Sequence, residues 1–105
     1  MIIKTNYIGK YLELSEPVGR MKWNNAMGRS YPDGWRVPTR AELVTVFDEA
    51  TDSGYVFDDM SVVWSSTSYA LDPTDAWNVY FCNGNSNPYV KTNRYAIRLV
   101  REVKG

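Results

Sequence analysis

The chain has 105 residues, of which 44% are hydrophobic and 14% aromatic, so a single domain of this size can bury a core of its own. It contains one cysteine and no histidine. These counts exclude an internal disulfide, the usual zinc sites, a serine-histidine-aspartate triad and a cysteine-histidine pair, because each needs imidazole or several thiolates. We therefore expect one domain over residues 1–105, with no catalytic residues, no cofactor and no metal.

The formal net charge is zero, but the charges are unevenly distributed along the chain. Residues 1–41 carry seven basic and three acidic side chains, residues 42–75 carry eight acidic and no basic ones, and residues 76–105 carry five basic and one acidic. Folding can pair these segments so that their fields cancel, or leave an acidic surface that attracts a partner. The candidate acidic surface consists of Asp48, Glu49, Asp52, Asp58 and Asp59.

Neither a membrane span nor a signal peptide is expected from the sequence. No apolar run approaches the roughly 18 residues that a transmembrane helix needs. The amino terminus also lacks a basic region followed by an apolar stretch. We therefore expect a cytoplasmic protein that does not contact a membrane.

The first third of the chain predicts extended structure, then a short helix, then a tight turn. Residues 2–14 favour strands, and Gly9 marks a turn or bulge within them. Residues 21–27 predict a short helix that ends near Gly28. Residues 31–34 have turn chemistry, because a proline restricts one backbone dihedral and a glycine permits a positive one.

The next element is a helix with a capping box at its start. Thr39 is predicted to be the N-cap, and Glu42, three residues later, can accept a hydrogen bond from the Thr39 amide. Apolar residues then recur at helical spacing, which indicates one face packed on a core. The residues of this face are Leu43, Val46, Phe47 and Ala50.

The second half of the chain predicts mainly strands. Residues 51–60 are expected to form a loop, a strand begins at Val62, and residues 71–75 form a turn-rich loop. Residues 77–82 alternate, with Trp77, Val79 and Phe81 on one face and Asn78, Tyr80 and Cys82 on the other. A hairpin turn at residues 83–85 and a final strand over about residues 95–103 complete the chain. Early helices and a late antiparallel sheet indicate an α+β domain.

Several strings in this order resemble the bacterial domain of unknown function 1566, also called the Lcl C-terminal domain, over about residues 18–101. The strings are Trp23 with Ala26; Gly34, Trp35, Arg36, Val37, Pro38, Thr39, Glu42 and Leu43; Trp64, Ser65, Ser66 and Thr67; Ala76, Trp77, Val79, Phe81, Asn83 and Gly84; and Tyr95, Ile97, Arg98, Leu99, Val100 and Arg101. The resemblance implies a compact C-type lectin-like fold, in which two helices flank antiparallel strands and the chain ends meet in a sheet. It also implies that Trp35, Trp64 and Trp77 are core residues and that Arg36 has a structural ion or carbonyl partner.

Two activities of similar families are not expected here. Formylglycine-generating enzymes use cysteines near the carboxyl end to hold copper, whereas this chain offers only Cys82, which we expect to be a small buried strand residue. Sugar-binding C-type lectins hold calcium with Glu-Pro-Asn and Trp-Asn-Asp strings. In this chain Asn87 and Pro88 are followed by Tyr89, and Asn78 is followed by a valine, so the carboxylates are missing and no calcium is expected.

The segment over residues 80–95 is the strongest candidate for a binding surface. Its tyrosines supply rigid area and its asparagines supply adaptable hydrogen bonds, as in many protein-binding loops. A hydrated hairpin whose tyrosines cover the sheet is the structural alternative. The candidate partner-binding residues, including the preceding loop, are Tyr69, Asp72, Asp75, Tyr80, Asn85, Asn87, Tyr89, Asn93, Arg94 and Tyr95.

We therefore expect a non-enzymatic protein-binding module, of the kind that a bacteriophage or mobile element uses to bind and inhibit a host protein. The alternative is a lectin-like domain that binds a glycan or a small molecule. Nucleic-acid binding is less favoured, because Arg98 and Arg101 lie in a predicted strand of the sheet.

Overall fold

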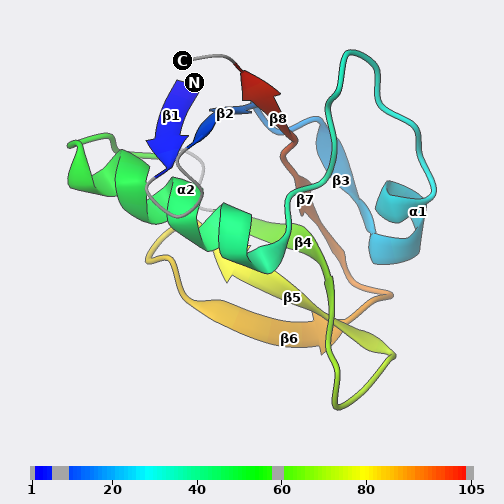
Figure 1. The fold of residues 1–105 in the computed structure, drawn as a ribbon. Helices are drawn as coiled ribbons and strands as arrows, with labels where there is room; N and C mark the ends of the chain where they lie inside the picture. The colour runs from blue at the N-terminus through cyan, green and yellow to red at the C-terminus, as the bar shows by residue number, and fades with distance from the viewer. Residues whose placement is uncertain (1, 6–9, 58–60, 104–105) are drawn as a thin grey trace.

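The computed structural model of the chain describes residues 2–5, 10–57 and 61–103 and has an α+β architecture, as expected (Figure 1). The predicted turn at Gly9 and the acidic residues Asp58 and Asp59 lie outside the described residues. The helices are α1 (Trp23–Met27) and α2 (Arg40–Asp52). The strands are β1 (Ile2–Thr5), β2 (Lys10–Leu14), β3 (Gly19–Lys22), β4 (Val62–Ser68), β5 (Asp75–Tyr80), β6 (Ser86–Val90), β7 (Arg94–Ile97) and β8 (Val100–Val103).

The described strands form two sheets. The smaller has the order β1-β2-β8 and is antiparallel, so it joins the beginning of the chain to its end, as the resemblance implies (Figure 1). The larger has the order β3-β7-β4-β5-β6. Its pairs are antiparallel except β4 with β7, which run parallel and align Val63 with Ala96.

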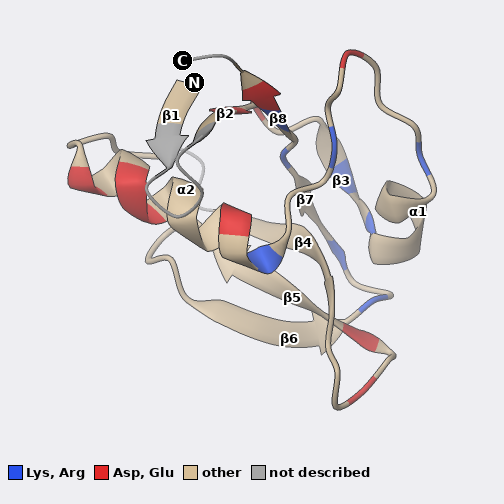
Figure 2. Cartoon of the chain, viewed as in Figure 1, with Lys and Arg blue, Asp and Glu red and all other residues tan. Residues whose placement is uncertain are grey.

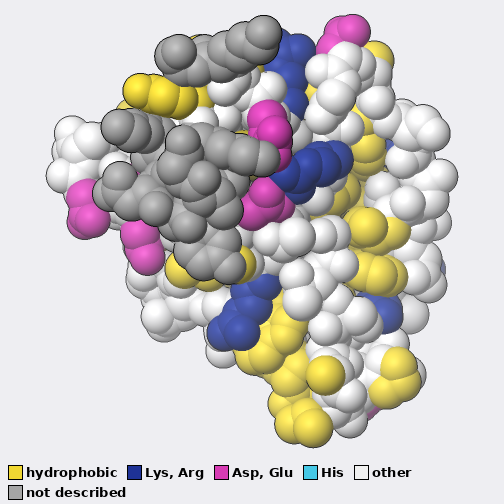
Figure 3. Space-filling model, viewed as in Figure 1, with side chains coloured by type: hydrophobic (Ala, Val, Ile, Leu, Met, Phe, Trp, Pro, Cys, Tyr) yellow, Lys and Arg dark blue, Asp and Glu magenta, His cyan; other side chains and the backbone are white. Residues whose placement is uncertain are grey.

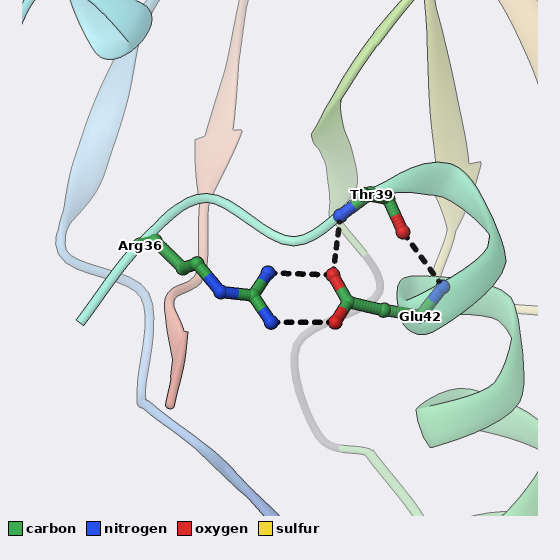
Figure 4. Close-up of polar contacts among 3 residues, drawn as sticks. All are labelled: Arg36, Thr39 and Glu42. Atoms are coloured by element: carbon green, nitrogen blue, oxygen red, sulfur yellow. Dashed lines mark hydrogen bonds and ion pairs between the residues drawn. The ribbon is translucent and has the colours of Figure 1, made fainter. Parts of the chain in front are cut away.

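The predicted capping box at the start of α2 is confirmed (Figure 4). The Glu42 amide donates to Thr39 Oγ1 at 3.2 Å, and the Thr39 amide donates to Glu42 Oε1 at 2.9 Å. Arg36 adds two hydrogen bonds from its guanidinium to the same carboxylate, each 2.6 Å long. Arg36 therefore has a structural ion partner, as the resemblance implies, and the turn before α2 is tied to its first helical turn.

The core has two parts, one on each side of the large sheet. Under α2, the first part combines the four predicted helix residues with side chains of both sheets and three packed phenylalanine rings; it includes Leu12, Leu14, Leu43, Val46, Phe47, Ala50, Phe57, Val63, Val79, Phe81, Ala96 and Val100. The second part surrounds Trp64, which is 0% exposed, and includes Met21, Ala26, Val37, Ala76, Ile97 and Leu99. The predictions for the apolar face of α2 and for Trp64 are therefore confirmed.

Three predicted boundaries are wrong. The short helix begins at Trp23 because Met21 pairs with Tyr95 as part of β3. The predicted loop at 51–60 begins later, since α2 continues to Asp52. The single final strand is instead two strands in different sheets, because β7 pairs with β3 and β4 whereas β8 pairs with β2.

Three side chains predicted to be buried are more exposed than expected. Cys82 is exposed, because β5 ends at Tyr80 and the chain then turns. Trp35 and Trp77 are half-buried rather than central to the core. A guanidinium covers each ring, with the Arg101 Cζ 4.4 Å from the Trp35 centroid and the Arg40 Cζ 3.7 Å from that of Trp77.

Candidate functional site

The alternation of β5 directs its side chains to two sides of the large sheet. Val79 enters the core under α2, so Asn78 and Tyr80 project from the opposite side. The antiparallel register of β6 places Asn87 opposite Asn78, and Tyr89 opposite Ala76. Cross-strand partners share a face, so both residues of β6 lie on the side away from α2.

Tyr80 and Tyr89 lean toward each other across this face. They stand on either side of the Asn78–Asn87 pair, yet the Tyr80 hydroxyl donates to the Tyr89 hydroxyl at 2.7 Å. The two rings are nearly parallel, 5° apart, with centroids 6.3 Å from each other. The two tyrosines therefore span the asparagine pair.

Tyr95, on β7, extends this group toward the second part of the core. Its ring centroid lies 6.1 Å from that of Tyr89 and 4.8 Å from that of Trp64. The side-chain amide of Asn93 donates through its Nδ2 to the Tyr95 hydroxyl at 3.1 Å. We call the surface formed by Tyr80, Tyr89, Tyr95, Asn87 and Asn93, together with Asn78 beneath it, the tyrosine face.

Asn78 is the unusual member of the tyrosine face. Its side chain is 0% exposed, and in the part of the chain that the structure describes neither its Nδ2 nor its Oδ1 has a hydrogen-bond partner. In the register, Trp64 lies opposite it on one side and Asn87 on the other. Roughly 90% or more of buried polar groups in proteins are hydrogen-bonded, so a buried amide with both atoms unpaired calls for a physical explanation.

The accessible members of the tyrosine face are its tyrosines and the outer asparagines. Tyr89 is 37% exposed, and Tyr80, Tyr95, Asn87 and Asn93 are half-buried. The hydrogen bond to Tyr89 raises the pKa of Tyr80 to about 12, so the Tyr80 hydroxyl remains neutral at physiological pH. The face thus offers polar, uncharged groups on rigid rings.

The structure brings together five of the predicted partner-binding residues on the tyrosine face, places Asn85 and Arg94 next to them by a backbone hydrogen bond or in the chain, and puts the other three on a different surface. The five on the tyrosine face are Tyr80, Asn87, Tyr89, Asn93 and Tyr95. Asn85 lies in the β5–β6 turn, and Arg94 is exposed at the start of β7. Sequence reasoning placed Asn78 on the same side of its strand as Tyr80 but did not include it among the binding residues, because burial without a partner is a tertiary property.

Tyr69, Asp72 and Asp75 belong to a different surface. The loop that holds them is closed by its own hydrogen bonds, including the Thr74 amide and hydroxyl donating to Asp72 Oδ1 at 3.0 and 2.7 Å, which lower the pKa of Asp72. Tyr69 meets the edge of Trp77, on the α2 side of the sheet. Figure 3 shows hydrophobic side chains gathered on this side, over β5 and the turn before it, next to basic side chains below the start of α2.

The three described residues of the predicted acidic surface, Asp48, Glu49 and Asp52, lie on α2, apart from the tyrosine face. Asp48 and Asp52 are exposed, and Glu49 is half-buried. Figure 2 shows acidic residues along α2, while basic residues occupy β3 and β7. Opposite charges meet where Arg36 pairs with Glu42 at 2.6 Å and Arg101 with Glu13 at 2.8 Å, whereas Asp48 and Asp52 remain exposed on α2.

Comparison with known proteins places the chain among one family of domains. The family model described as the Lcl C-terminal domain matches residues 12–101. No curated protein matches the sequence. Among the described residues, neither helix is long and apolar enough to cross a membrane.

Proposed function

The chain belongs to the Lcl C-terminal domain family, and from that premise we propose that it is a non-enzymatic protein-binding module whose binding surface is the tyrosine face. We further propose that the family membership carries a C-type lectin-like fold and that the bound partner is a host protein that the module inhibits. The β2–β8 pairing, which brings the chain ends together, supports the first of these two additions.

One observation carries the proposal: three tyrosines from three different strands form one contiguous, partly exposed surface. The Tyr89 ring contacts the other two, with its centroid 6.3 Å from that of Tyr80 and 6.1 Å from that of Tyr95. Tyrosine brings a large contact area with few rotatable bonds, so ordering it on binding costs little entropy. The neighbouring asparagine amides add adaptable hydrogen bonds, which is the composition typical of protein-binding loops.

The test compares two tyrosine variants as bait for host proteins. We expect Tyr89→Ala to weaken capture of a stoichiometric protein partner by roughly tenfold or more, since truncating a central tyrosine at an interface costs about 1.4 kcal/mol or more. Tyr55→Ala is the matched control, because Tyr55 is 44% exposed, comparable to Tyr89 at 37%, and lies away from the tyrosine face against Phe57. A partner bound equally by wild type and both variants would show that the tyrosine face is not the binding surface.

A cavity supports the second candidate function, binding of a small molecule or glycan. It has a volume of about 420 Å³, within the range of small-ligand sites, and is lined in part by Arg29, Tyr31, Trp35 and Arg36. Glycan-array binding that is lost in Trp35→Ala and retained in Tyr89→Ala would favour this function over the first. Capture of a protein that is lost in Tyr89→Ala and retained in Trp35→Ala would favour the tyrosine face.

A further inference from the structure

We propose that Asn78 recognises a primary carboxamide, the side chain of an asparagine or glutamine presented by the protein partner, and that Tyr80 and Tyr89 form a roof over it that opens on binding. This inference rests on the proposed function, because it assigns the chemistry at the centre of the tyrosine face.

The starting observation is a buried side-chain amide that has no hydrogen-bond partner within residues 2–5, 10–57 and 61–103. Leaving a buried polar group unpaired costs its full desolvation penalty, which a leucine of similar size would avoid. Asn78 is 0% exposed and both its polar atoms lack partners among the described residues. Neither Trp64 nor Ala76, which neighbour it on this side of the sheet, can supply both a donor and an acceptor to it.

The chemistry of the missing partner follows from that of Asn78. Its amide offers one carbonyl acceptor and one NH₂ donor side by side in a plane. A second primary carboxamide, turned head to head, satisfies both at once with two hydrogen bonds. A carboxylate can only accept and an ammonium can only donate, so either would leave one atom of Asn78 unpaired.

The roof explains how such a ligand reaches a buried amide. Tyr80 and Tyr89 meet through one hydroxyl-hydroxyl hydrogen bond and through their rings, and Tyr89 is 37% exposed. Opening the roof therefore breaks one neutral hydrogen bond and the ring contacts of Tyr89 with Tyr80 and Tyr95, all at the surface. A neutral hydrogen bond of this kind contributes little net stability. The freed hydroxyls remain beside the ligand and can bond to the partner's backbone.

The first experiment measures the stability of Asn78→Leu in the free protein. We expect its midpoint of urea unfolding to be equal to or higher than that of the wild type, because the unpaired polar group is replaced by an apolar one. A residue with a purely structural hydrogen-bonding role would behave in the opposite way. A lower midpoint for Asn78→Leu would therefore overturn the proposal.

The second experiment uses propionamide as the probe and follows side-chain amide signals by ¹H–¹⁵N NMR. We expect a saturable shift of the Asn78 NH₂ signals, with half-saturation at roughly 1–100 mM for a ligand of this size. The half-saturation concentration should be lower in Tyr89→Ala, where the roof is absent. Asn24 and Asn25, exposed on α1, are internal references whose signals should not saturate.

Matched probes decide the chemical class. Propionate tests a carboxylate, N-methylacetamide tests a backbone peptide group, and glucose tests sugar hydroxyls. A saturable shift of the Asn78 signals with one of these but not with propionamide would overturn the carboxamide assignment. The absence of a saturable shift with any probe, in both wild type and Tyr89→Ala, would overturn the site itself.

Partner binding by Tyr89→Ala and Asn78→Leu distinguishes failure of this inference from failure of the proposed function. If Tyr89→Ala loses the protein partner while Asn78→Leu binds it as tightly as wild type, the tyrosine face is the binding surface but Asn78 does not recognise the partner. If Tyr89→Ala retains the partner, the proposed function itself is wrong. Loss of roughly tenfold or more in affinity with Asn78→Leu, together with unreduced stability, supports both.

Discussion

The hydrogen bond between Tyr80 and Tyr89 shows how a single contact alters a side chain. The bond holds the Tyr80 hydroxyl in its neutral form and raises its pKa from 10.0 to about 12. The two rings that it joins are nearly parallel, 5° apart. A substitution that removes this hydrogen bond should therefore change both the pKa of Tyr80 and the arrangement of the two rings.

At the residue scale we predict that Tyr89→Phe lowers the pKa of Tyr80 from about 12 toward its ordinary value of 10.0. Because the folded pKa is raised, the stabilisation is complete below pH 10 and is lost as the pH rises through 12. Spectrophotometric titration of tyrosinate at alkaline pH measures the shift. Tyr55→Phe serves as the control, and identical titration of Tyr80 in wild type and Tyr89→Phe would contradict the prediction.

The start of α2 shows how an element is stabilised by neighbours in sequence. Thr39 and Glu42 satisfy each other's backbone amides, and Arg36, three residues before Thr39, binds the same carboxylate (Figure 4). Burial raises the pKa of Glu42, but the hydrogen bonds from Arg36 and from Thr39 outweigh it, and the pKa lies below 4.5. The ionised carboxylate is therefore the form that the fold stabilises.

At the element scale we predict that the stability of the protein falls with acidification partly through Glu42. A lowered pKa means that this stabilisation is present above pH 4.5 and is lost as the pH falls through the lower folded value. Glu42→Gln should lower the free energy of unfolding at neutral pH by about 1–3 kcal/mol, because a charged hydrogen-bond partner is lost. It should also make the free energy of unfolding depend less steeply on pH below neutrality. Urea unfolding across pH measures both. Asp48→Asn, exposed on the same helix, is the control and should do neither.

The molecule as a whole depends on the closing strand β8 to connect its parts. The Val100 amide donates to the Arg36 carbonyl at 2.9 Å and its carbonyl accepts from the Arg36 amide at 3.0 Å. Val100 is also opposite Leu14 in the small sheet, and its side chain is 0% exposed in the core under α2. One residue near the end of the chain thus links the small sheet, the core and the segment that leads into α2.

At the scale of the whole molecule we predict that Val100→Ala destabilises both sheets together. The loss should be roughly 2 kcal/mol, from two methylene-sized groups and the cavity that they leave. Tryptophan fluorescence reports on the four tryptophans, of which Trp64 is the one buried in the large sheet, and far-ultraviolet circular dichroism reports on both sheets. The urea midpoints of the two signals should shift by the same amount. Separate midpoints for the two signals would show that the sheets unfold independently.

The features that could be predicted from the sequence are those whose contacts are local. The capping box joins residues three apart, and the turn at residues 83–85 contains Gly84 with φ +79°, a conformation that glycine favours. The alternation along β5 also follows from the strand itself, so Asn78 and Tyr80 could be placed on one side before any fold was known. In each case the physical cause lies within a few residues of the feature.

The tertiary structure alone decided which strands pair and what they enclose. It divided the predicted last strand between two sheets, put Tyr69 and Asp72 on a different surface from the tyrosine face, and left Cys82 exposed. It also buried Asn78 between β4 and β6, where its side chain has no hydrogen-bond partner in the described part of the chain. Sequence by itself determined the family pattern, the start of α2 and the composition of the tyrosine-rich segment. The binding surface needed the fold, because registers between distant strands depend on the whole set of packing contacts, which no local pattern contains.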